Sequence, residues 1–309
     1  MNRREFVGAL GAGIVAFRNP AGRLLDGERF IERWSWAMGQ AVHLQLFAVD
    51  DAAGFEAAQR AFAELRRVER ALSLFDDASD LCEINRRAGR GSVTVGADLT
   101  AVLEAGLGFE RETHGAFNPA VEPLMRAWGF HAPRTREPTA GEIAEAREAA
   151  RGARIRIAGT RVTLGSEASQ LDLGGIGVGY GLDRAIGVLR AAGIRRAFLD
   201  VSGDCYGLGA PPGEHGWYVG VADPRRPGKE VASTRIRDQA IATSSNRVSV
   251  VRYGRAVRGH VMDPATGWPA SGEIQVTVVA RTGIEADALS TAILVSGTAG
   301  PGVLRSYLA

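Results

Sequence analysis

The chain has few of the features that mark out large protein classes. Its 309 residues include only two cysteines, Cys82 and Cys205. Nothing in the sequence brings these two together, so we expect free buried thiols, although an oxidising compartment would permit a disulfide. The formal net charge is only +2, so no global basic field points to nucleic acid as a partner. Repeats, coiled-coil heptads and long linkers are missing as well, and no zinc-ligand spacing links His43, His114, His131 and His215.

Long hydrophobic runs are also missing. The uncharged run Phe6–Phe17 is too short to span a bilayer, and it follows the paired arginines Arg3 and Arg4. This order matches a signal peptide of the twin-arginine type, the alternative being a basic start to an amphipathic helix. We therefore expect a signal segment at residues 1–23, without a clear cleavage site, and one domain at residues 24–309. Export would place the protein in the periplasm or on the extracytoplasmic face of the membrane, associated with it through the N-terminal segment.

The rest of the chain has the composition of a globular protein, with 45% hydrophobic and 23% charged residues. Helical periodicity occurs at residues 57–74, 100–112, 138–152, 182–192 and 286–296. Strand patterns occur at residues 41–49, 154–165, 196–204, 216–224, 247–254 and 273–280. Helices and strands mix without strict alternation. The sequence therefore predicts an α+β fold, with mixed, largely antiparallel sheets packed against helices, rather than a doubly wound sheet.

A glycine-rich stretch, "LDLGGIGVGYGLDRA" at residues 171–185, has the outline of a dinucleotide-binding turn. An apolar run precedes the glycines, a helical pattern follows them, and Asp200 ends the next strand. The three-glycine spacing G-x-G-x-x-G fails, however, because the glycines from Gly175 to Gly181 recur at every second residue. A nicotinamide cofactor is therefore the weaker interpretation, and the glycines more plausibly serve a close approach of the backbone to a ligand.

Other polar clusters indicate chemistry beyond a scaffold. Asp287 and Thr291 lie four residues apart in a helical pattern, so their oxygens face the same way and could hold a hard divalent cation. A tight turn holds His260 close to Asp263. Each cluster also has a plain alternative. The first could be a capped or solvated helix start, and His260 could be a hydrogen-bonded turn residue.

Taken in order, these clusters resemble one family, the FAD:protein FMN transferases of the ApbE family. The resemblance covers residues 36–297. It rests on the segments "AMGQ" (37–40), "LFDDASDLCEINR" (74–86), "GAFNPAVEPLMRAWGF" (115–130), "LDLGGIGVGYGLD" (171–183), "VSGD" (201–204), "ATSSN" (242–246), "HVMDPATGWP" (260–269) and "ADALSTA" (286–292). Each segment alone is a weak signal, whereas their shared order is a specific one. The resemblance implies an ApbE-like architecture related to the T-fold.

The resemblance also implies a reaction. FAD is the substrate, Mg²⁺ assists cleavage of its pyrophosphate, with Ca²⁺ or Mn²⁺ as alternative ions, and FMN passes to a threonine of a partner redox protein with release of AMP. Asp287, Thr291 and the carbonyl of Gly177 would bind the metal. The FAD-binding residues would be Met38, Phe75, Ala116, Phe117, Asn118, Trp128, Asp172, Gly175, Ser202, Gly203, Asp204, Thr243, Ser244 and His260. Either His260 or Asp263 would accept the threonine proton.

The sequence departs from the family pattern at several of these positions. Val178 stands where the family has lysine, and Asn118 replaces an aspartate. Ala120, Ser245 and Ala265 replace threonine, glycine and arginine. The lysine could touch phosphate, which valine cannot do. These changes leave a second hypothesis open, namely an FAD-binding or FAD-hydrolysing relative with weak or no transferase activity.

Overall fold

The computed structural model describes residues 27–224, 226, 228–247, 249–271, 273–297 and 303–308, and the predicted signal segment 1–23 lies outside them. A seven-stranded sheet runs through the molecule in the order β1-β2-β6-β7-β10-β13-β14, and every neighbouring pair is antiparallel. Its strands are β1 (Arg29–Ala37), β2 (Gln40–Ala48), β6 (Arg196–Val201), β7 (Asp204–Leu208), β10 (Gln239–Ser245), β13 (Glu273–Ala280) and β14 (Val303–Leu308). The predicted α+β class with antiparallel sheets is confirmed. No helix within these residues is long and apolar enough to cross a membrane.

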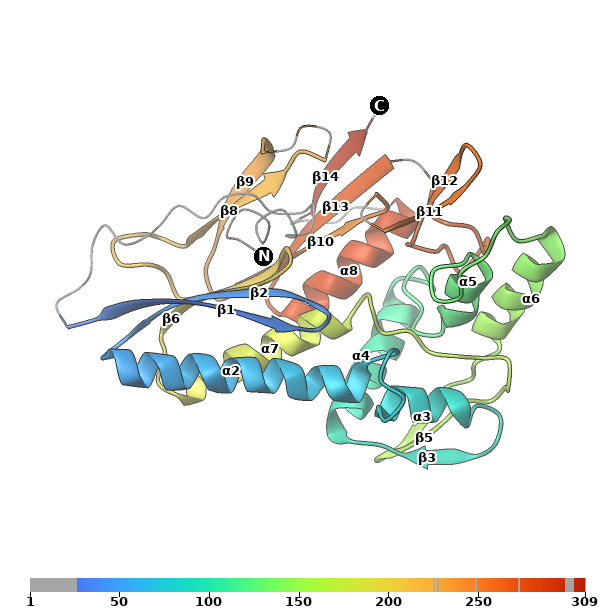
Figure 1. Ribbon diagram of the computed structural model, residues 1–309, viewed down its shortest axis with the longest axis horizontal. Helices are drawn as coiled ribbons and strands as arrows, with labels where there is room; N and C mark the ends of the chain where they lie inside the picture. Colours follow the sequence, from blue (N-terminus) through green and yellow to red (C-terminus); the bar gives the residue numbers. More distant parts are fainter. Residues whose placement is uncertain are drawn as a thin grey trace.

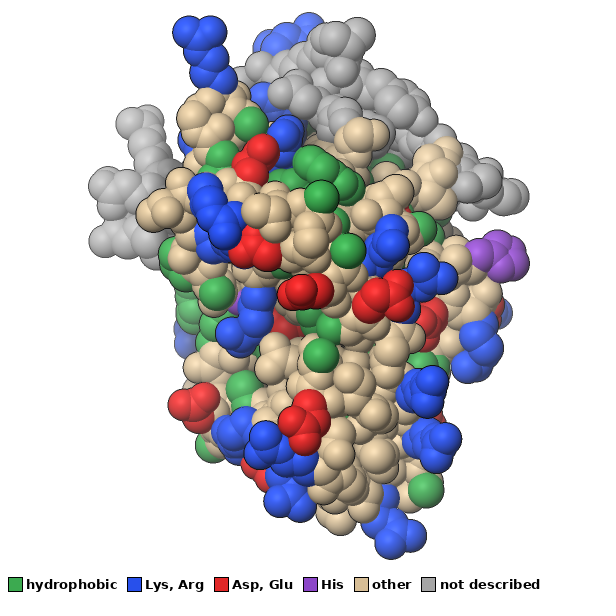
Figure 2. All heavy atoms as spheres, turned by 90° about the vertical axis from the view of Figure 1, so that its right-hand side faces the viewer, with side chains coloured by type: hydrophobic (Ala, Val, Ile, Leu, Met, Phe, Trp, Pro, Cys, Tyr) green, Lys and Arg blue, Asp and Glu red, His purple; other side chains and the backbone are tan. Residues whose placement is uncertain are grey.

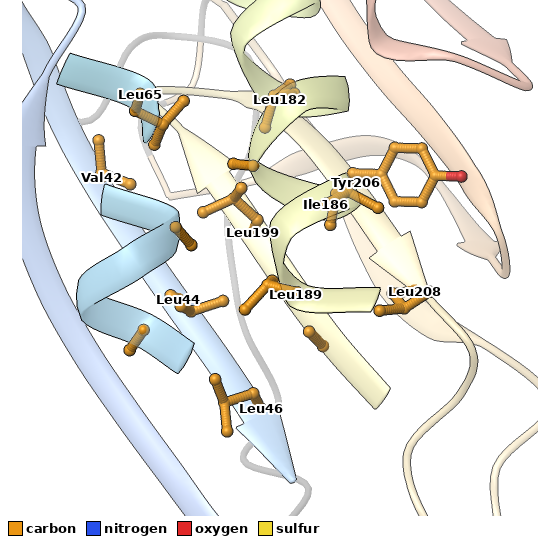
Figure 3. Close-up of a cluster of buried hydrophobic side chains, with 14 of the residues drawn as sticks. Val42, Leu44, Leu46, Leu65, Leu182, Ile186, Leu189, Leu199, Tyr206 and Leu208 are labelled. Carbon is orange, nitrogen blue, oxygen red and sulfur yellow. The ribbon is translucent and has the colours of Figure 1, made fainter. Parts of the chain in front are cut away.

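Three helices cover one face of this sheet (Figure 1). They are α2 (Asp51–Leu72), α7 (Gly177–Ala191) and α8 (Gly283–Ser296). Figure 3 shows the core between them, in which side chains of α2 and α7 meet alternate residues of β2, β6 and β7. Leu44 and Leu46 of β2 point into this core, as the period-two geometry of a strand requires. This core fixes the orientation of α7 and α8, whose N-terminal ends form part of the site.

The opposite face of the sheet is covered by the hairpin of β8 (Trp217–Ala222) and β9 (Glu230–Ile236). Phe47 and Phe198 point to this side and pack against Trp217. Strands β2 and β6 are thus covered on both faces, which explains why nearly all of their residues are buried, including the polar His43 and Asp200.

The remaining elements gather at one end of the molecule, on the right in Figure 1. They are α3 (Asp80–Arg86), β3 (Ser92–Thr94), α4 (Ala97–Glu112), α5 (Glu122–Ala127), α6 (Ala140–Arg151), β4 (Arg156–Ala158), β5 (Arg161–Thr163), β11 (Val250–Tyr253) and β12 (Ala256–Gly259). Figure 2 views this end and shows acidic and basic side chains interspersed over it. This distribution agrees with the nearly balanced net charge and gives no basic surface on this face for nucleic acid.

Several predicted elements are found with shifted ends. The helix predicted at residues 182–192 begins five residues earlier, at Gly177, because its glycines lie inside the first turns of α7 rather than before them. Strand β1 was not predicted, and neither was β10, which includes residues 242–245 of the segment "ATSSN". Cys82 and Cys205 are free thiols as expected, although only Cys205 is fully buried.

Candidate functional site

A pocket of about 600 Å³ opens where the N-terminal ends of α7 and α8 meet the C-terminal end of α2. Its wall includes the β1–β2 turn, the β6–β7 turn, the end of β10 and the loop that follows β12. Segments from Met38 to Thr291 therefore converge on one cavity. A pocket of this size and mixed lining is the usual form of a small-molecule site.

Most of the residues predicted from the sequence line this pocket. They are Met38, Phe75, Ala116, Phe117, Asn118, Asp172, Gly175, Gly177, Ser202, Gly203, Asp204, Thr243, Ser244, His260, Asp287 and Thr291. Phe75 remains 83% exposed although it lines the pocket, so its ring has a free face for stacking. The structure thus brings the predicted set together, while the role of each member stays a prediction.

Two glycines allow α7 and α8 to approach unusually closely. A Cβ atom at Gly179 would lie 2.2 Å from the carbonyl oxygen of Gly283, and one at Gly283 would lie 2.3 Å from the carbonyl oxygen of Gly179. The Asp183 carboxylate of α7 accepts hydrogen bonds from the first two backbone N–H groups of α8. Gly283 donates at 2.6 Å and Ile284 at 3.0 Å. In return, the backbone N–H of Gly179 donates to Oδ2 of Asp287 at 2.9 Å. The alternating glycines therefore serve helix packing that places the Asp287 carboxylate.

Hydrogen-bonded hydroxyl groups connect α8 to β10. The Ser244 hydroxyl lies 2.7 Å from Ser290 Oγ and 3.1 Å from Thr291 Oγ1. One strand further, the backbone N–H of Thr243 donates to Asp204 Oδ1 at 3.1 Å. The side-chain oxygens of Asp287 and Thr291 line the pocket one helical turn apart, as the sequence predicted.

The electrostatics of this region favour a cation. Burial, with a smaller contribution from the charge of Asp183, raises the pKa of Asp287 to about 7. Burial and the charge of Asp287 raise the pKa of Asp204 well above its usual value. No lysine or arginine is among the described residues that line the pocket. Buried carboxylates without a cationic side chain, accompanied by hydroxyl and backbone oxygens, form a donor set that suits a hard divalent ion.

The backbone oxygen that would complete this set is better supplied by Gly175 than by Gly177. Gly177 is the first residue of α7, where a carbonyl is engaged by an amide of the next helical turn. Gly175 precedes the N-cap residue Ile176, so its carbonyl lies outside the hydrogen-bond ladder of α7, and the first-turn N–H of Gly179 bonds to Asp287. Gly175 also lies against Thr291, because a Cβ at Gly175 would be 3.0 Å from Thr291 Oγ1.

The two candidate bases occupy different positions. His260 lines the pocket, and no hydrogen bond within the described residues satisfies its buried Nδ1. Burial lowers the pKa of His260, so its imidazole is neutral near pH 7 and able to accept a proton. Asp263 does not line the pocket. Its carboxylate oxygens accept hydrogen bonds from the Ala265 amide and the Thr266 hydroxyl, each at 2.8 Å, and so hold the turn that carries His260.

The position of Trp128 corrects the expectation that it lies along the flavin. Its side chain is fully buried, its Nε1 donates to the carbonyl oxygen of Gly267 at 2.8 Å, and its ring packs against Trp268. Trp128 therefore fastens α5 to the turn after His260 and does not reach the pocket. Two residues that no sequence pattern singled out lie in this region. They are His131, which lines the pocket, and Glu122.

Known proteins that resemble this chain belong to one family. The ApbE family matches residues 38–307 of the chain. An FAD:protein FMN transferase of Treponema pallidum is 31% identical over 287 residues, which are 87% of this chain and 79% of that protein. One from Klebsiella pneumoniae is 28% identical and is covered over 78% of its length, against 82% of this chain. A crystal structure of an ApbE protein from Thermotoga maritima superimposes with a TM-score of 0.79 at 29% identity, covering 86% of this chain and 87% of that one.

The apo form of a flavinyl transferase ApbE from Pseudomonas stutzeri has the same fold, with a TM-score of 0.79 at 23% identity, covering 92% of this chain and 96% of that one. The family match spans nearly the whole of the described chain, and it includes every segment that builds the pocket. The chain therefore belongs to the ApbE family and is a transferase.

Proposed function

We propose that the protein is a Mg²⁺-dependent FAD:protein FMN transferase. In the proposed reaction, it joins FMN through a phosphoester to a threonine of a partner redox protein and releases AMP. The observation that carries this proposal is the group of Asp287, Thr291 and Asp204 oxygens on the wall of a pocket whose described lining has no lysine or arginine. The names of the relatives supply the substrate and the direction of transfer.

In this proposal, Asp287, Thr291 and the carbonyl of Gly175 would hold the ion, which would offset the negative charge of the pyrophosphate. Phe75 offers its exposed ring to a ring of FAD. His260 accepts the proton of the acceptor threonine while the hydroxyl oxygen forms a bond to the FMN phosphorus. The bond from that phosphorus to the bridging oxygen breaks, and the bridging oxygen leaves with AMP.

A second candidate function is hydrolysis of FAD to FMN and AMP without transfer to protein. Val178 favours it, since this side chain lines the pocket and packs partly into the core where the family places a lysine. A water molecule at the position of the threonine hydroxyl would then attack the same phosphorus. Replacement of Val178 by lysine addresses this difference directly.

The two functions are separated by incubating the purified protein with FAD, Mg²⁺ and an acceptor domain that carries a threonine. Covalent fluorescent flavin on the acceptor supports transfer, and it should vanish when that threonine is changed to alanine. Asp287→Asn keeps an oxygen for the Gly179 amide and should abolish Mg²⁺-dependent turnover. Asp51→Asn, at the exposed start of α2, is the matched control and should keep full activity. Full activity in Asp287→Asn would refute the metal assignment.

We further propose that the protein acts outside the cytoplasm, where exported redox proteins would be its partners. The support is the pair Arg3 and Arg4 before an uncharged run. Replacement of both arginines by lysine should retain the protein in the cytoplasm. Cell fractionation measures this, and unchanged export of the double variant would refute the proposed signal.

A further inference from the structure

One ionisable cluster on the pocket wall is not used by the proposed reaction. His131 follows α5 and lines the pocket, with its ring edge against Phe75 at 5.6 Å between centroids. Its Nδ1 lies 2.5 Å from Oε2 of Glu122 and 4.0 Å from Oδ2 of Asp172. Glu122 is buried at the start of α5, and its other oxygen lies 2.7 Å from Nε of Arg126.

The distances favour a hydrogen-bonded pair over a metal site. The three groups lie within 4.8 Å of one another, a spacing at which side chains can share an ion. The 2.5 Å separation of Nδ1 and Oε2 is that of a direct hydrogen bond, which leaves no room for an ion between the two atoms. The Glu122 carboxylate thereby fixes the ring and orients its proton. The other ring nitrogen, Nε2, has no protein hydrogen-bond partner within the described residues.

The surroundings of His131 favour its charged form. Glu122 and Asp172 face it with negative charge, whereas Arg126 and the ring of His260 are its cationic or ionisable neighbours. Burial alone would lower the pKa of His131, but the two carboxylates outweigh burial and Arg126, and the pKa is raised above its usual value. No lysine or arginine is among the described residues that line the pocket, so His131, with its raised pKa, is the lining side chain of that part of the chain that most favours a positive charge.

We propose that the Glu122–His131 pair is a phosphate-binding site of the pocket, in which the Nε2–H of His131 donates to a phosphate oxygen of the nucleotide. The phosphate can belong to the FMN half or to the AMP half of FAD. This inference rests on the proposed function and extends it, because it names a residue of this chain that meets the charge of the substrate. Such a contact would supply the kind of interaction that Val178 cannot make.

The proposal is tested by measuring the binding of ligands that the protein would not convert, so that no catalytic activity is needed. Affinities for FMN, AMP, riboflavin and adenosine are measured by fluorescence or calorimetry with wild-type protein, His131→Gln and the exposed-site control His215→Gln. We expect His131→Gln to weaken binding of one of the two phosphate-bearing ligands about tenfold, the loss of one charge-assisted hydrogen bond. The ligand that is affected, FMN or AMP, identifies the half of FAD that lies at His131. Riboflavin, adenosine and the control variant should show no change.

The pH dependence of the same affinities gives a signature that a merely structural role would not produce. The favourable charge of His131 is present below its raised pKa and is lost as pH rises through it, so wild-type affinity for the phosphate ligand should fall over that range. The phosphate of the ligand titrates equally in both proteins, so the difference between the wild-type and His131→Gln curves reports His131. Glu122→Gln should move this fall to lower pH, since the carboxylate that raises the pKa is gone.

Three results would overturn the proposal. Equal losses for FMN and riboflavin, or for AMP and adenosine, would show that His131 only packs against the rings. Unchanged binding of all four ligands in a folded His131→Gln variant would show that no contact exists. Stoichiometric Zn²⁺ or Mg²⁺ binding that disappears in Glu122→Gln would show a metal site instead. Failure of the wild-type protein to bind FAD at all would refute the proposed function itself, whatever His131 does.

Discussion

A methyl group added at Gly179 tests whether the close crossing of α7 and α8 builds the proposed metal site. The Cβ of Gly179→Ala would lie 2.2 Å from the carbonyl oxygen of Gly283 and 2.8 Å from Cβ of Asp287. The nearest of these atoms belongs to the backbone, so no rotamer change can remove the clash. To restore ordinary contacts of about 3.5 Å, the two helices would have to move apart by about 1 Å.

The cost of this overpacking is about 1–3 kcal/mol in the free energy of unfolding. The helix propensity of alanine offsets roughly 0.5–1 kcal/mol of it. Each kcal/mol corresponds to a shift of about 2–4 °C in Tm for a large domain, so we expect Tm to fall by several degrees. Movement of α8 also lengthens the 2.9 Å bond from Gly179 to Asp287, so the affinity for Mg²⁺ should fall by a larger factor than stability alone suggests.

Gly187→Ala is the matched control, because Gly187 lies in the same helix and a Cβ there meets no atom within 4 Å. This variant should be as stable as the wild type or more stable by roughly 0.5–1 kcal/mol, with unchanged Mg²⁺ affinity. Thermal unfolding and calorimetric titration with Mg²⁺ measure both variants. Equal stability and equal Mg²⁺ affinity of Gly179→Ala and Gly187→Ala would refute the argument that the glycines serve this helix crossing.

Three further predictions concern the pocket. Because the pKa of Asp287 is raised to about 7 in the folded protein, the metal-free protein should lose stability as pH rises from about 4 through 7, and Mg²⁺ should raise Tm more at pH 8 than at pH 6. A Tm increment independent of pH would contradict this. Phe75→Ala should weaken FAD binding by about 1–3 kcal/mol, which is the contribution of one stacked ring. Tm should stay nearly unchanged, because the ring is 83% exposed. A large loss of Tm with intact FAD affinity would show a structural role instead. Val178→Lys should raise the rate of flavin transfer about tenfold through a charge-assisted contact to phosphate, and a rate equal to the wild type in the acceptor assay would show that position 178 does not limit transfer.

Local patterns in the sequence were sufficient to predict the parts of the site that lie within one element. The i, i+4 spacing of Asp287 and Thr291 predicts one helical face, and both residues line the pocket on α8. The start of α7 could not be predicted in the same way, because glycine has low helix propensity and the close contact of Gly179 with Gly283 joins residues that lie far apart in the sequence. Tertiary packing thus overrides the local preference at the point where the site is built.

Local sequence patterns could not predict where a side chain lies when its position depends on contacts with residues far away in the sequence. Trp128 belongs to an aromatic segment of the family, yet it bonds to Gly267, 139 residues away, and is closed off from the pocket. His131 follows the same segment and shows no ligand spacing, but the chain turns after α5 and returns it to Glu122. Glu122 and His131 are nine residues apart in the sequence, and neither the burial of Glu122 nor its contact with His131 can be read from that spacing.

The charges of the pocket determine what can enter it. Asp172, Asp204 and Asp287 all line it, and each has a pKa raised chiefly by burial, which shows that the wall disfavours further negative charge. FAD carries its own negative charge on the pyrophosphate, so it can bind tightly only with a cation that offsets both. In the proposed site, a divalent ion held by Asp287 and the charged form of His131 would supply that charge from separate groups of the wall. The affinity for FAD should therefore fall when Mg²⁺ is removed and, at saturating Mg²⁺, when His131 is replaced by Gln. Neither change should displace the aromatic contacts at Phe75.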